Sequence, residues 1–320
     1  MRPRVIGTGI ALIAACSLIA AASSSASNAS TPARSPVTLA TPACSRPHGA
    51  GQLSQSFTFD GKSRTYQLYV PAAYKGTQPV PLVFDFHGYG SSAVQQMDYG
   101  DFRPQADKFD FLIVAPDGQT SAGSGRHFSF GNEPGLQNDL AMVKSLMTHL
   151  ESTLCVDAAR IYSTGMSDGG AITSILACSA NDRFAAFASV AVIIYCGGNG
   201  TRPVAIAAFS GTADPVVPFN GGKVHCCSGS VVASAPGSMA SWAKYDHCGP
   251  KFTDTRLGTQ VRRRMWKGCR PADAPVFYII DGGGHTWPGA VPIPRLGLTT
   301  QQIDASAVIW KFFAAHKLVK

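Results

Sequence analysis

The chain has 320 residues and a formal net charge of +8 at neutral pH. Its one dense basic run, Arg262-Arg263-Arg264, has alternating neighbours and indicates the exposed part of a strand, so we expect no nucleic-acid partner. Beyond the first residues no apolar stretch is long enough to cross a bilayer, so we expect no membrane span.

The N-terminal residues predict export from the cell. Arg2 and Arg4 precede a long apolar run, and small residues follow it, as in a signal peptide over residues 1–26. Lipid anchoring is an alternative, because residues 13–16 resemble a bacterial lipobox that ends at Cys16. The apolar run continues past that cysteine, which favours cleavage and release as a secreted, extracellular protein.

Residues 27–43 are rich in Ser, Ala, Thr and Pro and predict a disordered leader. The remaining residues, 44–320, are enough for one domain with a sizeable core. Of the nine cysteines, all but Cys16 lie in that domain, and an even number in an exported chain indicates disulfides. A zinc site would need paired ligands such as Cys-x-x-Cys, which are absent, so we expect no metal. The domain's cysteines are Cys44, Cys155, Cys178, Cys196, Cys226, Cys227, Cys248 and Cys269.

Strand and helix patterns alternate along this domain. Residues 54–59 and 64–70 alternate apolar and polar side chains around a turn, which predicts a hairpin. The other predicted strands are 81–86, 111–115, 160–164, 187–194, 204–209 and 276–280. The predicted helices are 136–154, 170–177, 238–246 and 303–316. This alternation predicts an α/β fold in which a doubly wound, mostly parallel sheet forms a single domain.

Residues 165–169, Gly-Met-Ser-Asp-Gly, match the pattern of a nucleophile elbow. They lie between a predicted strand and a predicted helix, so Ser167 would stand in a tight turn at the start of the helix. The two glycines remove side chains that would clash in that turn, and amides at a helix N-terminus can bind an oxyanion. An ordinary Gly-Ser turn would explain the motif but not its position. The sequence therefore predicts a serine hydrolase.

A serine nucleophile needs a base, and the base needs an acid that orients it. In hydrolases of this architecture both follow strand ends, in the chain order Ser, Asp, His. Asp214, just past the strand at 204–209, is the predicted acid. Its rival, Asp281, lies so close to the histidine loop that we expect a structural turn contact. His285, which follows three glycines, is the predicted base, and His225 is the weaker competitor.

An oxyanion hole needs two backbone amides. One is the amide of Asp168, which follows the nucleophile. The other should come from the turn after an earlier strand, and residues 87–90, His-Gly-Tyr-Gly, follow the strand at 81–86. We predict the amide of Tyr89 as the second donor. An ordinary glycine turn would explain the glycines but not their coincidence with the other three elements.

Four segments together resemble the secreted polyhydroxybutyrate depolymerase and feruloyl esterase family: 87–90, 165–170, Gly-Thr-Ala-Asp at 211–214 and Gly-His-Thr-Trp-Pro-Gly at 284–289. The last segment is the most specific, and the resemblance runs from about Phe57 to the C-terminus. It implies an α/β-hydrolase fold and carboxylic ester hydrolysis without a metal or organic cofactor. It also implies the nucleophile, acid and base named above.

Members of this family act on polyesters of hydroxy acids, or on feruloyl and acetyl esters of plant polysaccharides. We expect esters of the polyhydroxybutyrate type, as oligomers or amorphous polymer, because no appended domain that would bind crystalline polymer is present. A feruloyl or acetylxylan esterase is the alternative. A non-catalytic binding protein on the same fold would be expected to lack a triad residue, and none is missing. The sequence does not predict an oligomeric state.

Trp287 follows the predicted base by two residues, and two roles for it are open. Its ring could lie at the mouth of the active site and bind substrate. It could instead pack inward and brace the loop that carries His285.

The resemblance implies a disulfide between Cys248 and Cys269. Cys178, at the end of the predicted nucleophile helix, could reach Cys196, which follows the next strand. Each of these bridges would close a short loop and contribute about 3 kcal/mol. The other four cysteines leave two possibilities: a Cys44–Cys155 bridge with a vicinal Cys226–Cys227 pair, or separate partners for the two adjacent cysteines.

Overall fold

The computed structural model describes residues 44–121, 123–131, 133–197, 202–227, 229–270 and 273–318. The predicted signal peptide, leader and lipid-anchor cysteine lie outside these residues. The described residues belong to one compact unit.

A ten-stranded sheet runs through this unit in the order β1-β2-β4-β3-β5-β6-β7-β12-β11-β10. The six central strands, from β4 to β12, are parallel, and the two strands at each edge are antiparallel to their neighbours. The strands of the sheet are β1 (Gly51–Phe59), β2 (Lys62–Val70), β3 (Val80–Phe86), β4 (Leu112–Pro116), β5 (Val156–Met166), β6 (Ala186–Val190), β7 (Ile206–Gly211), β10 (Phe252–Arg256), β11 (Val261–Trp266) and β12 (Val276–Ile280). A small separate hairpin pairs β8 (Gly222–Lys223) with β9 (Val231–Val232).

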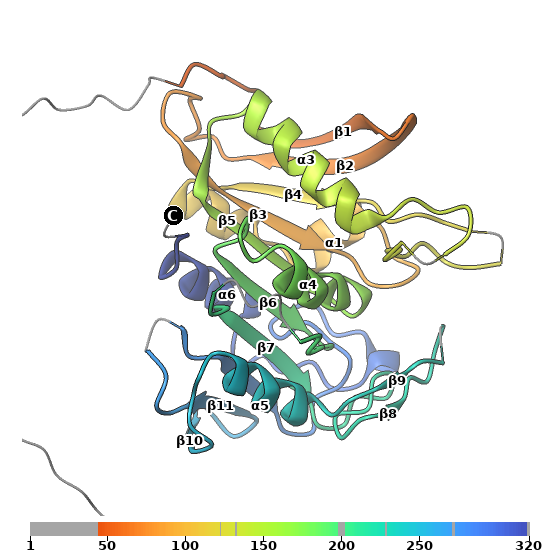
Figure 1. Cartoon of the computed structure of the whole chain (residues 1–320), viewed down its shortest axis with the longest axis vertical. Helices are drawn as coiled ribbons and strands as arrows, with labels where there is room; N and C mark the ends of the chain where they lie inside the picture. The colour runs from red at the N-terminus through yellow and green to blue at the C-terminus, as the bar shows by residue number, and fades with distance from the viewer. Residues whose placement is uncertain are drawn as a thin grey trace, which may run out of the picture. The chain divides into compact units, whose positions relative to one another are not determined.

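Helices cover both faces of the sheet, which confirms the predicted doubly wound arrangement. One face packs against α3, α4 and α5, which lie in front of the sheet in Figure 1, and the other packs against α1, α2 and α6. The helices are α1 (Ala93–Tyr99), α2 (Arg103–Phe109), α3 (Asp139–Thr153), α4 (Asp168–Ser179), α5 (Ala235–Tyr245) and α6 (Ala305–Ala314).

Strand β3 shows why the centre of the sheet reads as a continuous apolar run. All seven of its residues are buried. Leu82 and Phe84 belong to the core beneath α3 and α4, whereas Val83 belongs to the core beneath α1 and α6. Successive side chains of a strand point to opposite faces, so a strand covered on both faces is apolar at nearly every position. The exception in β3 is Asp85, which is buried and accepts a hydrogen bond from the Gln96 side chain at 2.8 Å.

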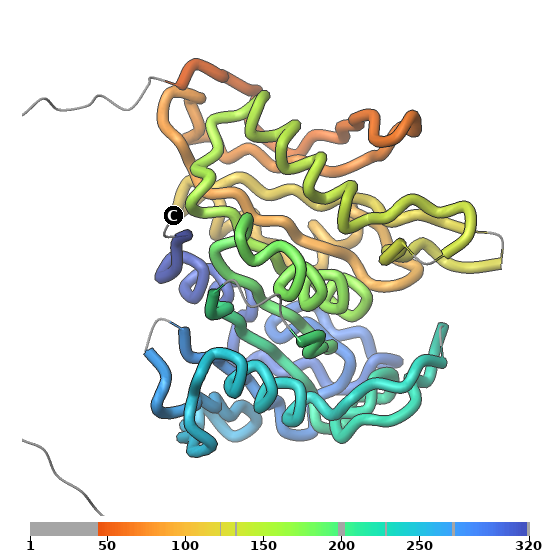
Figure 2. The backbone as a smooth tube through the Cα atoms, viewed as in Figure 1, coloured from red at the N-terminus to blue at the C-terminus, as the bar shows by residue number. Residues whose placement is uncertain are grey.

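The end of the chain is fastened to the centre of the sheet. After α6, drawn in blue in Figure 2, the amide of Leu318 donates to the carbonyl of Ala159 at 2.8 Å, and the hydroxyl of Tyr162 donates to the carbonyl of His316 at 2.8 Å. Ala159 and Tyr162 both belong to β5, the strand that leads to the predicted nucleophile.

Two helices and three strands among the described residues were not predicted from the sequence patterns: α1, α2, β8, β9 and β10. Helices α1 and α2 have seven residues each, too short for a clear helical period. All five residues of β10 are exposed, so it lacks a buried face. The arginine run lies on β11 as predicted, but it is half-buried rather than exposed, because Arg262 and Arg264 form ion pairs with Asp254 and Asp281.

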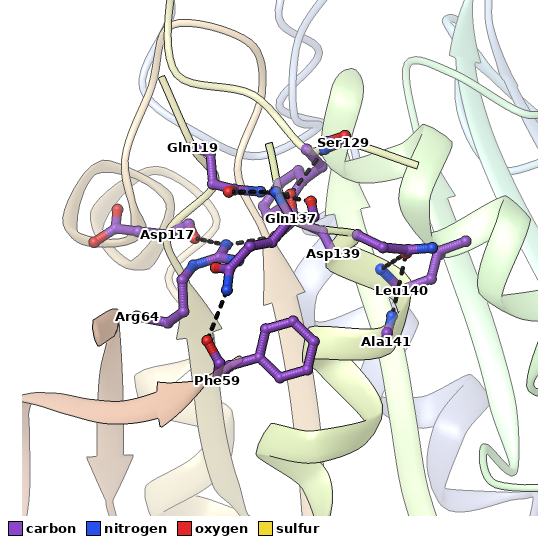
Figure 3. Close-up of polar contacts among 12 residues, drawn as sticks. Phe59, Arg64, Asp117, Gln119, Ser129, Gln137, Asp139, Leu140 and Ala141 are labelled. Carbon is purple, nitrogen blue, oxygen red and sulfur yellow. Dashed lines mark hydrogen bonds and ion pairs between the residues drawn. The ribbon is translucent and has the colours of Figure 1, made fainter. Parts of the chain in front are cut away.

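A buried polar cluster holds the long loop between β4 and α3, as Figure 3 shows. Arg64 on β2 forms an ion pair with Asp139, the first residue of α3, and both side chains are almost completely buried. The Asp139 carboxylate also accepts hydrogen bonds from the Gln119 side chain at 3.1 Å and from the Ser129 amide at 2.8 Å. Because one carboxylate binds the sheet and two points of the loop, it fixes the loop against the sheet edge.

No helix among the described residues is both long enough and apolar enough to pass through a bilayer.

Candidate active site

Each predicted site segment follows the C-terminal end of a parallel strand. The 87–90 turn follows β3, the elbow follows β5, the Asp214 loop follows β7 and the His285 loop follows β12. The carboxyl ends of parallel strands meet at one edge of a sheet, where ligand sites of such sheets form. The topology therefore brings segments separated by about 200 residues to one place.

Ser167 occupies a strained turn between β5 and α4. Its backbone angles are φ 58° and ψ −115°, a conformation that costs a non-glycine residue about 1–3 kcal/mol. The turn is crowded, because a Cβ atom at Gly169 would lie 2.0 Å from the carbonyl oxygen of Phe86 and one at Gly165 would lie 2.6 Å from the same oxygen. The amide of Ser167 donates to the carbonyl of Val190 at 2.9 Å, which ties the turn to β6. These features are those of a nucleophile elbow.

His285 and Asp214 form a buried pair. The imidazole Nδ1 of His285 lies 2.8 Å from Oδ2 of Asp214, and both side chains are nearly inaccessible to solvent. The other carboxylate oxygen, Oδ1, accepts the amides of Val216 and Val217 at 2.7 and 2.8 Å. Because the ionised carboxylate of Asp214 only accepts hydrogen bonds, its Oδ2 must accept from Nδ1 of His285. Nδ1 therefore carries the imidazole proton, and Nε2 has a free lone pair that can act as a base.

The rival residues make other contacts. Asp281 accepts three hydrogen bonds from Arg262, at 3.1, 2.9 and 2.6 Å, and this guanidinium lowers the pKa of the carboxyl group. Asp281 was expected to make a structural turn contact, and the contact observed is an ion pair with Arg262 on the neighbouring strand β11. His225 lies on the β8–β9 hairpin, where its Nδ1 is 3.0 Å from the carbonyl oxygen of Pro215.

His87 is a residue of this site for which the sequence suggested no role. Its ring is fully buried, and this desolvation lowers its pKa to about 4, so the imidazole is neutral. Its Nε2 is 2.9 Å from the amide of Gly118, which must donate to it, so the proton is on Nδ1 and is donated to the carbonyl of Gly88 at 2.8 Å. That carbonyl belongs to the same peptide group as the amide of Tyr89. In a trans peptide the two point in opposite directions, so His87 fixes the direction of the Tyr89 N–H.

The side chain of Tyr89 is also fixed. Its hydroxyl oxygen accepts the amide of Gly125 at 2.7 Å, and its ring stacks on that of His127 with the centroids 5.6 Å apart. The ring is 38% exposed and lines the cleft described below. The tip of the loop between β4 and α3 therefore supports the turn that carries the predicted second oxyanion donor.

Asp168, the first residue of α4, has a role in its side chain as well as in its amide. Its amide is at a helix N-terminus, where backbone donors have no partner within the helix. Its carboxylate accepts the amide of Phe128 at 2.8 Å and so links the elbow to the neighbouring loop. Burial raises the pKa of this carboxyl group to about 6.

A cleft of about 700 Å³ contains both Ser167 and His285. The 88–99 segment contributes mainly polar groups to its lining, and the 216–227 and 291–296 segments contribute mainly apolar ones. The residues with polar side chains are Tyr89, Ser91, Gln95, Gln96, Asp98 and Tyr99. The apolar side chains are Val216, Val291, Ile293, Leu296 and the paired Cys226 and Cys227, with Arg295 among them.

Trp287 does not line this cleft, which favours the bracing role over the substrate-binding role. Only 1% of the residue is exposed, and its ring packs edge-on against Phe102 with the centroids 5.9 Å apart. Its indole N–H donates to the hydroxyl of Ser306 on α6 at 3.0 Å. The side chain faces the core because this contact satisfies its one polar group there. The alternative, a bracing role, agrees with these contacts.

The four disulfides of the described residues resolve the open pairings. The predicted Cys248–Cys269 and Cys178–Cys196 bridges are confirmed. The remaining four cysteines pair as Cys44–Cys155 and as the vicinal Cys226–Cys227. Among the described residues, no group of three or more His, Cys, Asp or Glu side chains is placed to hold a metal ion.

Comparison with known proteins points to one group of enzymes. A family model described as "Esterase PHB depolymerase" matches residues 64–235. A curated relative named "Probable feruloyl esterase C" from Aspergillus niger is 32% identical over 267 residues, covering 79% of this chain and 84% of the relative. "Feruloyl esterase B" from Piromyces equi is 28% identical over 223 residues, covering 67% of this chain but only 41% of the relative's length.

Solved structures share the fold. The structure titled "Acetyl xylan esterase from Aspergillus awamori" superposes with a TM-score of 0.57 at 15% identity, covering 82% of this chain and 99% of that one. A structure titled "Crystal Structure of a Thermostable Esterase" gives a TM-score of 0.53 at 17% identity, covering 83% of this chain and 63% of that one. At these identities the likeness concerns the fold alone.

Proposed function

The chain belongs to the PHB depolymerase family of esterases and is a carboxylic ester hydrolase with the α/β-hydrolase fold, and from this premise we propose that it is a feruloyl esterase. Its substrates are then esters between a hydroxycinnamic acid, such as ferulic acid, and a sugar of a polysaccharide. This choice reverses the order expected from the sequence, which placed polyhydroxybutyrate esters first.

The main support for this proposal is that polar and apolar residues of the cleft lining come from different segments. An ester of ferulic acid with a sugar has one flat, largely apolar half and one half rich in hydroxyl groups. The cleft offers apolar side chains from the 216–227 and 291–296 segments and hydrogen-bonding side chains from the 88–99 segment. Pockets bind by apolar contact and are made selective by a few polar groups. The names of the relatives, feruloyl esterases B and C, agree with this assignment.

The reaction proceeds through an acyl-enzyme in which Ser167, Asp214 and His285 are the triad. Nε2 of His285 takes the proton of the Ser167 hydroxyl as its oxygen attacks the ester carbonyl carbon. Asp214 holds the imidazole and stabilises its positive charge. The same proton then passes to the leaving alcohol, and a water molecule, activated by His285, releases the acid.

The negative charge that develops on the carbonyl oxygen is bound by two backbone amides, those of Asp168 and Tyr89. The first stands at the N-terminus of α4, and the second is oriented by the hydrogen bond from His87 to the carbonyl of Gly88. Both donors are held before substrate arrives, so little reorganisation is needed as charge develops.

The proposal includes secretion. Four disulfides among the described residues agree with an oxidising compartment. A polymeric substrate outside the cell would require such a location.

Hydrolysis of polyhydroxybutyrate esters is a second candidate, favoured by one observation. Val291 lines the cleft and is 78% exposed, so a large apolar side chain faces solvent at the place where a polymer would enter. Such a side chain is suited to an apolar polyester surface.

Initial rates on methyl ferulate, acetylated xylan and a polyhydroxybutyrate emulsion test the assignment. The purified protein should release ferulic acid fastest, and the Ser167→Ala variant should release none, because loss of the nucleophile of a triad lowers turnover by about 10⁶. Release of hydroxybutyrate at a higher rate than ferulic acid would replace the first candidate with the second. Activity that survives Ser167→Ala would contradict the proposed nucleophile.

A further inference from the structure

The disulfide between Cys226 and Cys227 lies in the wall of the cleft that contains Ser167 and His285. Both of its cysteines are exposed. In each of the other three bridges at least one cysteine is buried or half-buried.

This bridge differs from the other three in what it can do for stability. Those join residues separated by 111, 18 and 21 positions, so each closes a loop and restricts the unfolded chain. The bridge between Cys226 and Cys227 joins neighbours in sequence and closes no loop beyond its own ring. Loop entropy therefore does not explain the presence of the Cys226–Cys227 bridge. Its position in the cleft lining suggests a role in substrate binding instead.

The bridge is held firmly against the site. It lies at the turn of the β8–β9 hairpin, where the amide of Gly229 donates to the carbonyl of Cys226 at 3.0 Å. The preceding residue, His225, donates its amide to the carbonyl of Val216 at 2.9 Å. Val216 itself donates to Asp214, so the hairpin is fastened to the loop that carries the predicted acid.

The chemistry of the bridge suits an apolar ligand. Two bonded sulfur atoms form a compact, polarisable surface without a hydrogen-bond donor, and sulfur makes favourable contacts with aromatic rings. Val216, Ile293 and Leu296 line the same cleft, so the bridge continues an apolar surface. Neither the bridge nor these three side chains has a hydrogen-bonding group that a bound ring would desolvate, and Arg295 is the charged residue of the same segments.

We propose that the Cys226–Cys227 disulfide is a specificity element that contacts the acyl group of the substrate. The identity of this acyl group rests on the proposed function: for a feruloyl esterase, the group that contacts the bridge is the aromatic ring of the hydroxycinnamic acid. Separate thiols or hydroxyl groups at these positions would present polar, mobile side chains instead of this surface.

The test compares three esters with one leaving group: 4-nitrophenyl acetate, 4-nitrophenyl octanoate and 4-nitrophenyl ferulate. The ratio of kcat/KM for ferulate to that for acetate is measured for the wild type and for Cys226→Ser/Cys227→Ser. We expect the ratio to fall about three- to tenfold, mainly through a higher KM for ferulate, as the loss of a sulfur–aromatic contact implies. The control is Cys248→Ser/Cys269→Ser, whose bridge lies outside the cleft lining and should leave the ratio as it is.

An unchanged ratio in Cys226→Ser/Cys227→Ser overturns the proposal. An equal loss of kcat/KM on ferulate and acetate also overturns it, because the bridge would then only support the Asp214 loop. If the wild type hydrolyses the acetate but not the ferulate, the feruloyl assignment has failed. The proposal is then tested with the ratio of kcat/KM for octanoate to that for acetate. A fall in that ratio supports the specificity element, and no fall overturns it.

Discussion

The ring of His87 accepts a hydrogen bond from the amide of Gly118 at 2.9 Å, and this single contact determines which ring nitrogen carries the proton. The other nitrogen must then donate to the carbonyl of Gly88, whose peptide group supplies the amide of Tyr89. A loop 31 residues away in sequence thus sets the direction of a proposed oxyanion donor. His87 acts through that peptide and is a positioning residue, since it does not line the cleft.

Two substitutions at His87 separate its two contacts. The side-chain amide of Asn can take the place of Nδ1 and still donate to Gly88, whereas that of Gln reaches the place of Nε2 and keeps the contact with Gly118. We expect His87→Gln to lower kcat about tenfold or more with little change in KM, since removal of one oxyanion donor costs about 10²–10³. His87→Asn should keep more of the activity. Steady-state kinetics on 4-nitrophenyl acetate measure both, with thermal unfolding as a check on folding. Equal losses in the two variants would argue for a packing role.

Asp214 and Asp281 are distinguished by their partners. Asp214→Asn should lower kcat by about 10⁴, the cost of losing the orienting carboxylate of a triad, while the protein stays folded. Asp281→Asn should keep wild-type kcat and lose about 0.5 kcal/mol of unfolding free energy, because its partially exposed ion pair with Arg262 is screened by water. Kinetics and urea unfolding of both variants decide the matter. A collapse of kcat in Asp281→Asn alone would show that Asp281, and not Asp214, orients His285.

The raised pKa of Asp168 predicts a pH dependence of stability. Its pKa is about 6 in the folded protein against 3.8 for an ordinary aspartate, so the folded state holds this proton more tightly than the unfolded state. The resulting stabilisation is complete below about pH 4 and is lost as the pH rises through 6. Asp168→Asn keeps an oxygen for the amide of Phe128 but cannot ionise. Between pH 4 and 7.5 the variant should therefore gain about 2–3 kcal/mol relative to the wild type.

Urea unfolding of wild type and Asp168→Asn at several pH values measures this difference directly. Carboxyl groups remote from Asp168 titrate equally in both proteins and cancel in the comparison, whereas His127 does not, because the charge of Asp168 contributes to its raised pKa. Parallel stability curves would mean that Asp168 ionises in the folded protein at its ordinary pKa.

Trp287 should affect stability rather than substrate binding. Trp287→Ala removes a buried ring from its contact with Phe102 and should lower the unfolding free energy by about 3–5 kcal/mol. Trp287→Phe keeps a ring but loses the hydrogen bond to Ser306, so a smaller loss is expected. KM for 4-nitrophenyl ferulate should stay near its wild-type value in both variants. A rise in KM for the ferulate ester with unchanged stability would indicate that Trp287 contacts the substrate.

The sequence by itself determined the elements whose signal is local. A buried parallel strand needs apolar residues on both faces, so 81–86 was recognisable as β3 without any knowledge of its neighbours. The elbow around Ser167 was equally recognisable from its local Gly-x-Ser-x-Gly pattern between a strand and a helix, although the contact that excludes a side chain at 165 and 169 is with Phe86 on β3. The order of strand ends along the chain was then enough to predict Asp214 and His285 as partners.

Only the tertiary structure decided how residues distant in sequence meet. Periodicity shows that a side chain is buried but not against what, so the two roles of Trp287 stayed open until its contacts with Phe102 and Ser306 were seen. The role of His87 depends on Gly118, which a different strand's loop supplies. The place of the Cys226–Cys227 bridge beside Ser167 likewise arises from the packing of a hairpin onto the Asp214 loop, a long-range contact that leaves no periodic pattern in the sequence.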